Sequence, residues 1–242
     1  MTNKGIDYLF TKRYLDFDVI EKFKLCYCDE YGDFITRGVD NYLDFTMPKI
    51  DPRFYDSAIF PIFDLYGKVI GVSARSLSDT NDLKYINTVY TKGRHLYGLN
   101  LTWYDCLQKR KVYVVEGNVD VVRMYQAGVK NVVGMLGSTL SVTQLAVLSR
   151  FVDEVIFVPD GDKAGAKFLE RVAIGTPNRK SLTSKHTNLN LRFSLIKLPE
   201  GLDPDSFLND HTAEDLFKLE EPVTSDLFIT YHKKLGGKTD EW

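Results

Sequence analysis

Four short apolar segments in the second half of the chain constrain its fold more than any other feature. Each is dominated by β-branched or other apolar residues: KVYVVEG from Lys111, NVVGML from Asn131, DEVIFVPD from Asp153 and LRFSLIKLP from Leu191. Continuous apolar runs of this length are typical of strands that are buried on both faces of a mostly parallel sheet. The segments therefore predict a sheet that is covered by helices on both sides.

Helices are predicted between these strands, over residues 119–127, 142–151 and 163–174. Ser141 and Gln144 form a capping box at the start of the second helix. Strands that alternate with helices through short loops predict βαβ units. Residues 176–190 are polar and rich in turn formers, which predicts a loop, and one further helix is predicted over residues 213–235.

Residues 1–100 have a different pattern. One amphipathic helix is predicted over residues 6–23, and two apolar runs on either side of Tyr66-Gly67-Lys68 predict a β-hairpin. Short strands in this region favour antiparallel pairing. The expected fold class is therefore α/β (α+β overall), with a mixed α+β N-terminal part followed by a mostly parallel sheet flanked by helices.

The composition excludes several classes of protein. The chain has 242 residues, of which 44% are hydrophobic and 26% charged, with no signal peptide and no segment that could span a bilayer. The cysteines Cys26, Cys28 and Cys106 suit a reducing cytoplasm and provide no zinc site. A net charge of −2 argues against a strongly basic nucleic-acid binder, although residues 84–94 contain three basic side chains and no acidic one.

Pairs of carboxylates follow three of the four predicted strands. The pairs are Glu116 with Asp120, Asp160 with Asp162, and Asp203 with Asp205. Acidic residues at the carboxyl ends of parallel strands converge on the crevice where such sheets bind ligands. Because crowded carboxylates raise each other's pKa or require cations, and because oxygen-only ligand sets suit Mg²⁺ or Mn²⁺, the pattern predicts a divalent-metal site for phosphoryl transfer.

Each acidic residue also has a structural explanation when taken alone. Asp120 could balance a helix dipole, and Asp203 could be an N-cap with Pro204 at the first helical position. Burial could raise the pKa of Glu116, which would suit it for proton transfer. The joint occurrence of the pairs along one βα series favours the metal site.

The order EGNVD, DGD and DPD in this series resembles the Toprim domain. Upstream, IGVSARSLSD and LKYINTVYTKGRHLYGL resemble the basic segment that precedes this domain in DnaG-type bacterial and phage primases. The resemblance covers roughly residues 5–210. It implies a basic α+β subdomain of the primase core over residues 1–105, a Toprim metal-binding domain over 106–212, and a C-terminal helical segment and tail over 213–242.

The resemblance also implies roles for individual residues. Glu116 would be the general acid or base, acting in a catalytic set with Asp120, Asp160 and Asp162. Two or more Mg²⁺ or Mn²⁺ ions would be held by Glu116, Asp120, Asp160, Asp162, Asp203 and Asp205. Template or nucleotide phosphates would be bound by Arg75, Lys84, Lys92, Arg94 and Lys163, for which a solvated basic face is the alternative. Gly137, Ser138 and Thr139 could hold an anion or simply cap a helix.

The activity implied by the resemblance is synthesis of short RNA primers on single-stranded DNA from ribonucleoside triphosphates. We expect a phage-encoded catalytic core whose partners are a replicative helicase and a separate zinc-binding module, with no membrane association. Asn118 stands where an aromatic residue is common in the family. The alternatives are a Toprim-type metal-dependent nuclease and a non-catalytic module that binds single-stranded DNA or a helicase. A topoisomerase would need a large additional domain that carries a strand-cleaving tyrosine.

Overall fold

The computed structural model describes residues 4–29, 31, 34–35, 51–78, 85–137, 140–161, 175–176, 179–180 and 191–223. The chain divides into two compact units, Met1–Thr91 and Lys92–Trp242, and each is described by itself. The predicted boundary between residues 105 and 106 lies inside helix α3 (Leu99–Lys109), whereas the division by compactness comes before this helix. The functional division of the chain into 1–105, 106–212 and 213–242 stays a prediction.

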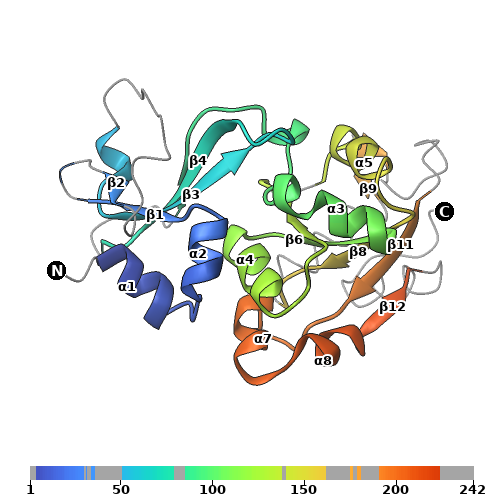
Figure 1. Cartoon of the computed structure of the whole chain (residues 1–242). Helices are drawn as coiled ribbons and strands as arrows, with labels where there is room; N and C mark the ends of the chain where they lie inside the picture. Colours follow the sequence, from blue (N-terminus) through green and yellow to red (C-terminus); the bar gives the residue numbers. More distant parts are fainter. Residues whose placement is uncertain are drawn as a thin grey trace. The chain divides into compact units, whose positions relative to one another are not determined.

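The first unit contains an antiparallel sheet with the strand order β2-β1-β3-β4-β5 (Figure 1). Its elements are α1 (Lys4–Thr11), α2 (Phe17–Lys22), β1 (Cys26–Cys28), β2 (Phe34–Ile35), the 3-10 turn η1 (Pro52–Phe54), β3 (Ser57–Phe63), β4 (Val69–Ser76) and β5 (Tyr85–Asn87). The mixed α+β prediction for this region is confirmed. Cys26 and Cys28 are buried in β1, as expected for two ordinary thiols on a strand.

The single helix predicted over residues 6–23 is wrong, because the chain forms two helices. Tyr14 adopts a left-handed conformation with φ 51° between α1 and α2. The Leu15 amide donates to the Leu9 carbonyl over 3.1 Å, and both leucine side chains are fully buried. The apolar residues keep a helical spacing in the sequence across this break, although Phe10, Tyr14 and Phe17 are exposed, so the pattern alone gave no sign of it.

The hairpin predicted at Tyr66-Gly67-Lys68 is confirmed between β3 and β4. The Asp64 carboxylate accepts hydrogen bonds from the Tyr66 and Lys68 amides, each over 2.9 Å. Gly67 has φ 85°, a conformation that favours glycine at the tip of a tight turn. The turn residues therefore determine the register of this pair of strands.

The second unit contains a five-stranded sheet with the order β12-β11-β8-β6-β7 (Figure 1). Four strands are parallel, and β12 pairs with β11 in antiparallel orientation. The elements are the 3-10 turn η2 (Lys92–Arg94), α3, β6 (Lys111–Val115), α4 (Asn118–Gln126), β7 (Val132–Gly134), α5 (Val142–Leu148), β8 (Glu154–Val158), β9 (Gly175–Thr176), β10 (Arg179–Lys180), β11 (Arg192–Ile196), α7 (Pro204–Asp210), α8 (Ala213–Phe217) and β12 (Glu220–Pro222). The mostly parallel sheet flanked by helices is thus confirmed.

Three predictions in the second unit need correction or fall outside the described residues. The helix predicted over 213–235 ends at Phe217, and the chain then pairs with β11 as strand β12. The short β9–β10 pair overlaps the start of the predicted loop 176–190. The helix predicted over 163–174 lies outside the described residues.

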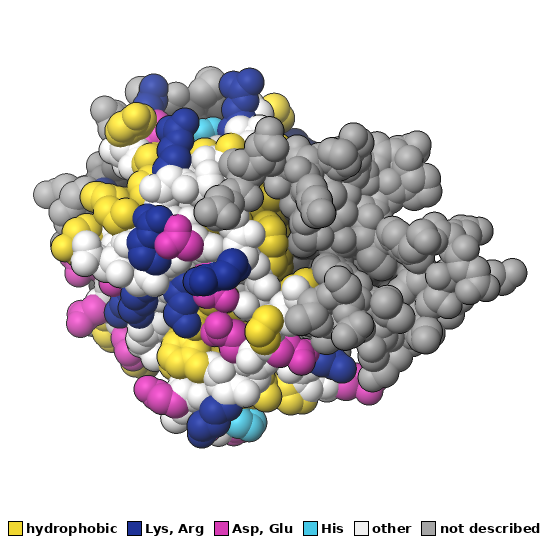
Figure 2. Space-filling model, turned by 90° about the vertical axis from the view of Figure 1, so that its right-hand side faces the viewer, with side chains coloured by type: hydrophobic (Ala, Val, Ile, Leu, Met, Phe, Trp, Pro, Cys, Tyr) yellow, Lys and Arg dark blue, Asp and Glu magenta, His cyan; other side chains and the backbone are white. Residues whose placement is uncertain are grey.

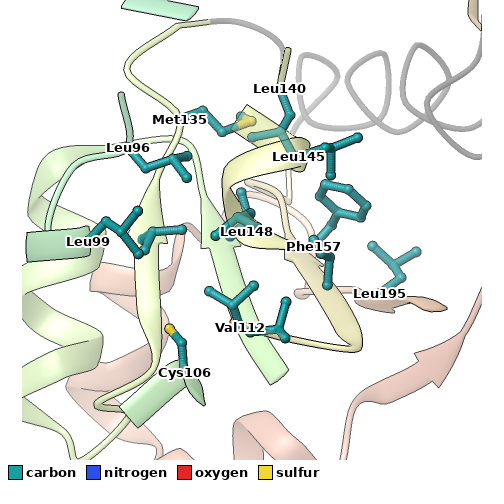
Figure 3. Packing of buried hydrophobic residues seen from close by; sticks show 14 residues of the cluster. Leu96, Leu99, Cys106, Val112, Met135, Leu140, Leu145, Leu148, Phe157 and Leu195 are labelled. Atoms are coloured by element: carbon teal, nitrogen blue, oxygen red, sulfur yellow. The ribbon is translucent and has the colours of Figure 1, made fainter. Parts of the chain in front are cut away.

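Both faces of the parallel sheet are buried, which explains the continuous apolar runs. On one face, Val112 and Val114 of β6 pack in a cluster with side chains of α3 and α5, including Leu99 and Leu145 (Figure 3). On the other face, the Tyr113 ring stacks on Phe217 of α8 with ring centroids 5.5 Å apart. Because helices cover both sides, the four positions of the strand after Lys111 are buried and none of them is charged.

The visible surface carries both signs of charge. Figure 2 shows one face on which Lys and Arg side chains alternate with Asp and Glu, which agrees with the net charge of −2. Within the described ranges, no helix combines the length and the apolar character that crossing a bilayer requires.

Candidate functional site

The order of the parallel strands places a switch point at β6. From β6 the chain runs through α4 to β7 on one side, and later returns through α5 to β8 on the other side. Val115, the last residue of β6, pairs with Val158, the last residue of β8. Glu116 follows β6 directly and Asp160 lies two residues beyond β8, so both lie at the edge where parallel α/β sheets bind ligands.

Asp120 lies at the centre of the acidic cluster. This carboxylate is 6% exposed, and it accepts hydrogen bonds from the Gly117 amide over 3.1 Å and from the Asp205 amide over 3.2 Å. Burial, followed by the negative charges of Asp160, Asp203 and Asp205, raises the pKa of Asp120 well above its usual value. The structure therefore brings together carboxylates from all three predicted pairs.

Gly161 brings the loop after β8 against the loop after β11. A Cβ atom at this position would lie 2.1 Å from the Pro199 carbonyl oxygen. The Gly161 amide donates to the Leu202 carbonyl over 2.7 Å, and the Gly201 amide donates to the Gly161 carbonyl over 2.9 Å. This close approach, which only glycine permits, holds two acidic loops together.

The last acidic pair opens helix α7. Asp203 is the N-cap: one of its carboxylate oxygens accepts hydrogen bonds from the Ser206 amide, over 2.7 Å, and from the Ser206 hydroxyl. Pro204 occupies the first helical position, as predicted for a cap. Asp203 therefore caps the helix and also contributes its charge to the cluster around Asp120.

Asp205 forms a buried ion pair with Arg123 of α4. The Arg123 Nε atom lies 2.9 Å from Asp205 Oδ1, and the two side chains are 8% and 7% exposed. Arg123 Nη2 also donates to the Leu208 carbonyl, over 3.2 Å, and to Asn209 Oδ1, over 3.0 Å. Sequence reasoning missed Arg123, although its position three residues after Asp120 places it on the same side of the helix.

The chemistry of this cluster fits a divalent cation. Asp120, Asp160 and Asp203 offer only oxygen atoms, and burial together with the negative charges of Asp160 and Asp203 raises the pKa of Asp120. As they stand, no three His, Cys, Asp or Glu side chains among the described residues are arranged around a common ion. Asp162 lies outside the described residues.

In the first unit, Arg75 of β4 lies among aromatic rings. Its guanidinium carbon is 5.5 Å from the centre of the Tyr8 ring and 5.3 Å from that of Tyr85, and Nη1 donates to the Tyr85 hydroxyl over 3.2 Å. Arg13 Nε donates to the Tyr8 hydroxyl over 2.7 Å. Burial raises the pKa of Tyr85, while the charges of Arg75 and Arg13 act in the opposite direction.

In the second unit, Lys92 and Arg94 are exposed on the η2 turn. The buried side-chain amide nitrogen of Gln144 donates to the carbonyls of Lys92, His95 and Met135, over 3.2, 2.6 and 3.0 Å. The Ser141 hydroxyl accepts a hydrogen bond from the backbone amide of Gln144 over 3.0 Å, which confirms the predicted capping box. The backbone that carries the two basic side chains is thus fixed by the start of α5.

Several predicted site residues lie outside the described part of the chain: Lys84, Ser138, Thr139, Asp162 and Lys163. Gly137 is exposed. Arg75 belongs to the first compact unit, whereas Lys92, Arg94 and the described carboxylates belong to the second.

Two family models match consecutive parts of the chain. The model of the DNA primase catalytic core, N-terminal domain, matches residues 1–102, and that of the Toprim domain matches residues 110–184. The DNA primase of Rickettsia prowazekii is 31% identical over 255 residues, covering 98% of this chain. The chain belongs to the DnaG-type primase cores. The predicted family and fold are thereby confirmed.

Solved structures of DnaG-type primases have the same fold. The Aquifex aeolicus primase, with its zinc-binding and RNA polymerase domains, is similar over 97% of this chain and 60% of its own, with 26% identity and a TM-score of 0.74. A DnaG primase catalytic domain bound to single-stranded DNA is similar over 96% of this chain and 76% of its own, with 26% identity and a TM-score of 0.70. The chain spans 33% of the Lactococcus lactis primase and 41% of the Rickettsia prowazekii primase.

Proposed function

We propose that the chain is a primase catalytic core that synthesises short RNA primers on single-stranded DNA. The supporting observation is the acidic cluster around Asp120, which lies at the switch point of a DnaG-type sheet. In this reaction a ribose 3′-hydroxyl attacks the α-phosphate of a ribonucleoside triphosphate, and pyrophosphate leaves. The reaction needs a proton acceptor for the hydroxyl and positive charge near the phosphates.

Mg²⁺ or Mn²⁺, when bound, would neutralise phosphate charge and lower the pKa of the attacking hydroxyl. Asp120, Asp160, Asp162 and Asp203 would hold the metal. Hydrogen bonds from backbone amides already orient Asp120 and Asp203. A carboxylate that is oriented before the cation arrives loses less freedom on binding.

Glu116 would transfer the proton of the attacking hydroxyl. It is half-buried at the end of β6, directly before the turn into α4. A rigid strand end keeps such a side chain in a fixed position relative to the aspartates. This role needs no direct contact with the metal.

The basic side chains would bind anionic ligands in two places. Arg75, held between Tyr8 and Tyr85, would bind the single-stranded template through its phosphates and nearby rings. Lys92 and Arg94 would bind the triphosphate or the template backbone. The relative described above as bound to single-stranded DNA supports this choice of ligand.

The chain's partners and origin remain part of this proposal. A replicative helicase and a separate zinc-binding module would complete the priming system in the cytoplasm. The relatives reported above are bacterial, and a phage origin stays a prediction.

Incorporation of labelled ribonucleotides on single-stranded DNA, with Mg²⁺ or Mn²⁺, tests the proposal when it is run beside Asp160→Asn. We expect short metal-dependent RNA products that disappear in the variant. Degradation of the template instead would identify a nuclease. Absence of both activities, even when a zinc-binding module and helicase from a related primase are added, would contradict the proposal.

A further inference from the structure

We infer that Arg123 acts as a built-in cation of the acidic cluster, so that Asp205 is its counter-ion and not a metal ligand. This inference rests on the proposed metal site and specifies which carboxylates form it. The sequence resemblance treats the six acidic residues as equivalent members of one ligand set. The structure separates Asp205 from the others.

The first support for this inference is the set of contacts that Arg123 makes. Its guanidinium forms an ion pair with Asp205 Oδ1 and donates hydrogen bonds to the Leu208 carbonyl and to Asn209 Oδ1, and all three partners lie on α7. The side chains of Arg123 and Asp205 are both more than nine-tenths buried. A hydrated cation would have to displace a guanidinium held by this ion pair and two hydrogen bonds before it could bind Asp205 Oδ1.

The second support is the permanent charge of Arg123 beside Asp205. A guanidinium cannot be deprotonated in a protein, so Arg123 contributes a permanent positive charge. A buried carboxylate without a cation is strongly unfavourable, whereas a paired and hydrogen-bonded one is tolerated. Asp205 therefore has a cationic partner within the protein before any metal arrives.

The third support is a hydrogen bond from the backbone of α7. The Asp205 amide donates to Asp120 Oδ1 over 3.2 Å, so the position of α7 determines one hydrogen bond of the central carboxylate. Arg123 belongs to α4, as Asp120 does. The ion pair thus joins the helix that carries Asp120 to the helix that donates a hydrogen bond to it.

The test measures Mn²⁺ binding to the full chain without nucleotide, by electron paramagnetic resonance of free Mn²⁺. The double variant Arg123→Met/Asp205→Asn removes both charges of the pair and leaves the net charge of the cluster unchanged. We expect its Mn²⁺ affinity to stay within about threefold of the original chain, whereas Asp160→Asn should lose at least about tenfold. A loss in the double variant as large as in Asp160→Asn would overturn the inference.

The single variant Arg123→Met gives an independent readout. It leaves Asp205 uncompensated, so Mn²⁺ should bind about tenfold more tightly or with one additional ion, and Mn²⁺ should recover most of the lost thermal stability. Arg123→Lys keeps a charge and serves as the folding control. Unchanged Mn²⁺ affinity and stoichiometry in Arg123→Met would contradict the built-in cation.

The inference and the proposed metal site fail in different ways. If Asp160→Asn binds Mn²⁺ as tightly as the original chain, the metal site itself is wrong and the inference fails with it. If Asp160→Asn loses binding and the double variant loses it equally, the metal site stands and only the role assigned to Arg123 fails.

Discussion

The two compact units place their chemically active side chains in different ways. In the second unit, the carboxylates follow the ends of parallel strands, and the sheet order alone brings Glu116 and Asp160 to one edge. In the first unit, Arg75 projects from an antiparallel strand and meets Tyr8 of a helix and Tyr85 of the next strand. Sites at parallel strand ends can therefore be predicted from the order of the segments, whereas sites on an antiparallel face require the tertiary packing.

The largest expected effect concerns the site at the ends of the parallel strands. Glu116→Gln should lower primer synthesis by about 10²–10⁴-fold, because it removes a proton-transfer group without changing the shape of the side chain. Thermal unfolding should be nearly unchanged. Glu200→Gln, at an exposed position in the loop after β11, is the matched control and should keep full activity. Equal activity in the two variants would remove Glu116 from the reaction.

A second variant tests whether the loops at the strand ends are held by backbone contact. Gly161→Ala should lower the free energy of unfolding by about 1–3 kcal/mol, because its Cβ atom would clash with the Pro199 carbonyl. Gly137→Ala, where a Cβ atom would meet open space, should change it by less than about 0.5 kcal/mol. Denaturant unfolding of both variants is the measurement, and equal values would show that the close approach is not required.

The raised pKa of Asp120 predicts a pH dependence for the second unit. Because the folded-state pKa lies above the usual value near 3.9, the protonated form is favoured in the folded chain, and its stability contribution is lost as pH rises through the folded-state value. Metal-free protein should therefore lose more stability with rising pH than Asp120→Asn does. Mg²⁺ should reduce this loss. Melting curves from about pH 4 upward measure it, and parallel curves for the two proteins would contradict the prediction.

The smallest effect concerns the antiparallel face. Arg75→Lys keeps the charge but loses the ring contacts and the hydrogen bond to Tyr85, so template affinity should fall by about 0.5–1 kcal/mol. Arg75→Ala should also reduce the salt dependence of binding by about one phosphate contact. Arg53→Lys, an exposed arginine paired with Asp51, is the control. Fluorescence anisotropy on single-stranded DNA would show no change in either Arg75 variant if Arg75 were only part of a solvated face.

Patterns among neighbouring residues predicted those elements whose structure depends on neighbouring residues. The buried strands, the Ser141–Gln144 capping box, the Asp203 cap and the hairpin at Gly67 all follow from a few neighbouring residues. The position of the carboxylate pairs after the strands predicted the acidic set, and the family resemblance added roles for its members. In the fold, Asp160, Asp203 and Asp205 lie close enough to Asp120 for their charges to raise its pKa.

Tertiary packing determined what the sequence could not predict. The chain turns at the left-handed Tyr14, after α1 has ended at Thr11, while the apolar period of the sequence continues. Strand β12 forms where a helix was expected because its partner β11 offers an edge for pairing. Arg123 belongs to the same helix as Asp120, yet its partner Asp205 lies 82 residues away in the sequence. Contacts at that separation leave no local pattern.

The pair of hydrogen bonds between Gly161 and the loop after β11 has a consequence for motion. The Gly161 amide donates to the Leu202 carbonyl, and the Gly161 carbonyl accepts from the Gly201 amide, so both backbone polar groups of Gly161 join the two loops. Displacement of α7 would therefore carry Asp160 along with Asp203, and the spacing of these two carboxylates would change little during turnover. Slow hydrogen exchange at the Gly161 amide, together with faster exchange in the exposed η2 turn, would be the signature of a site that moves as a block.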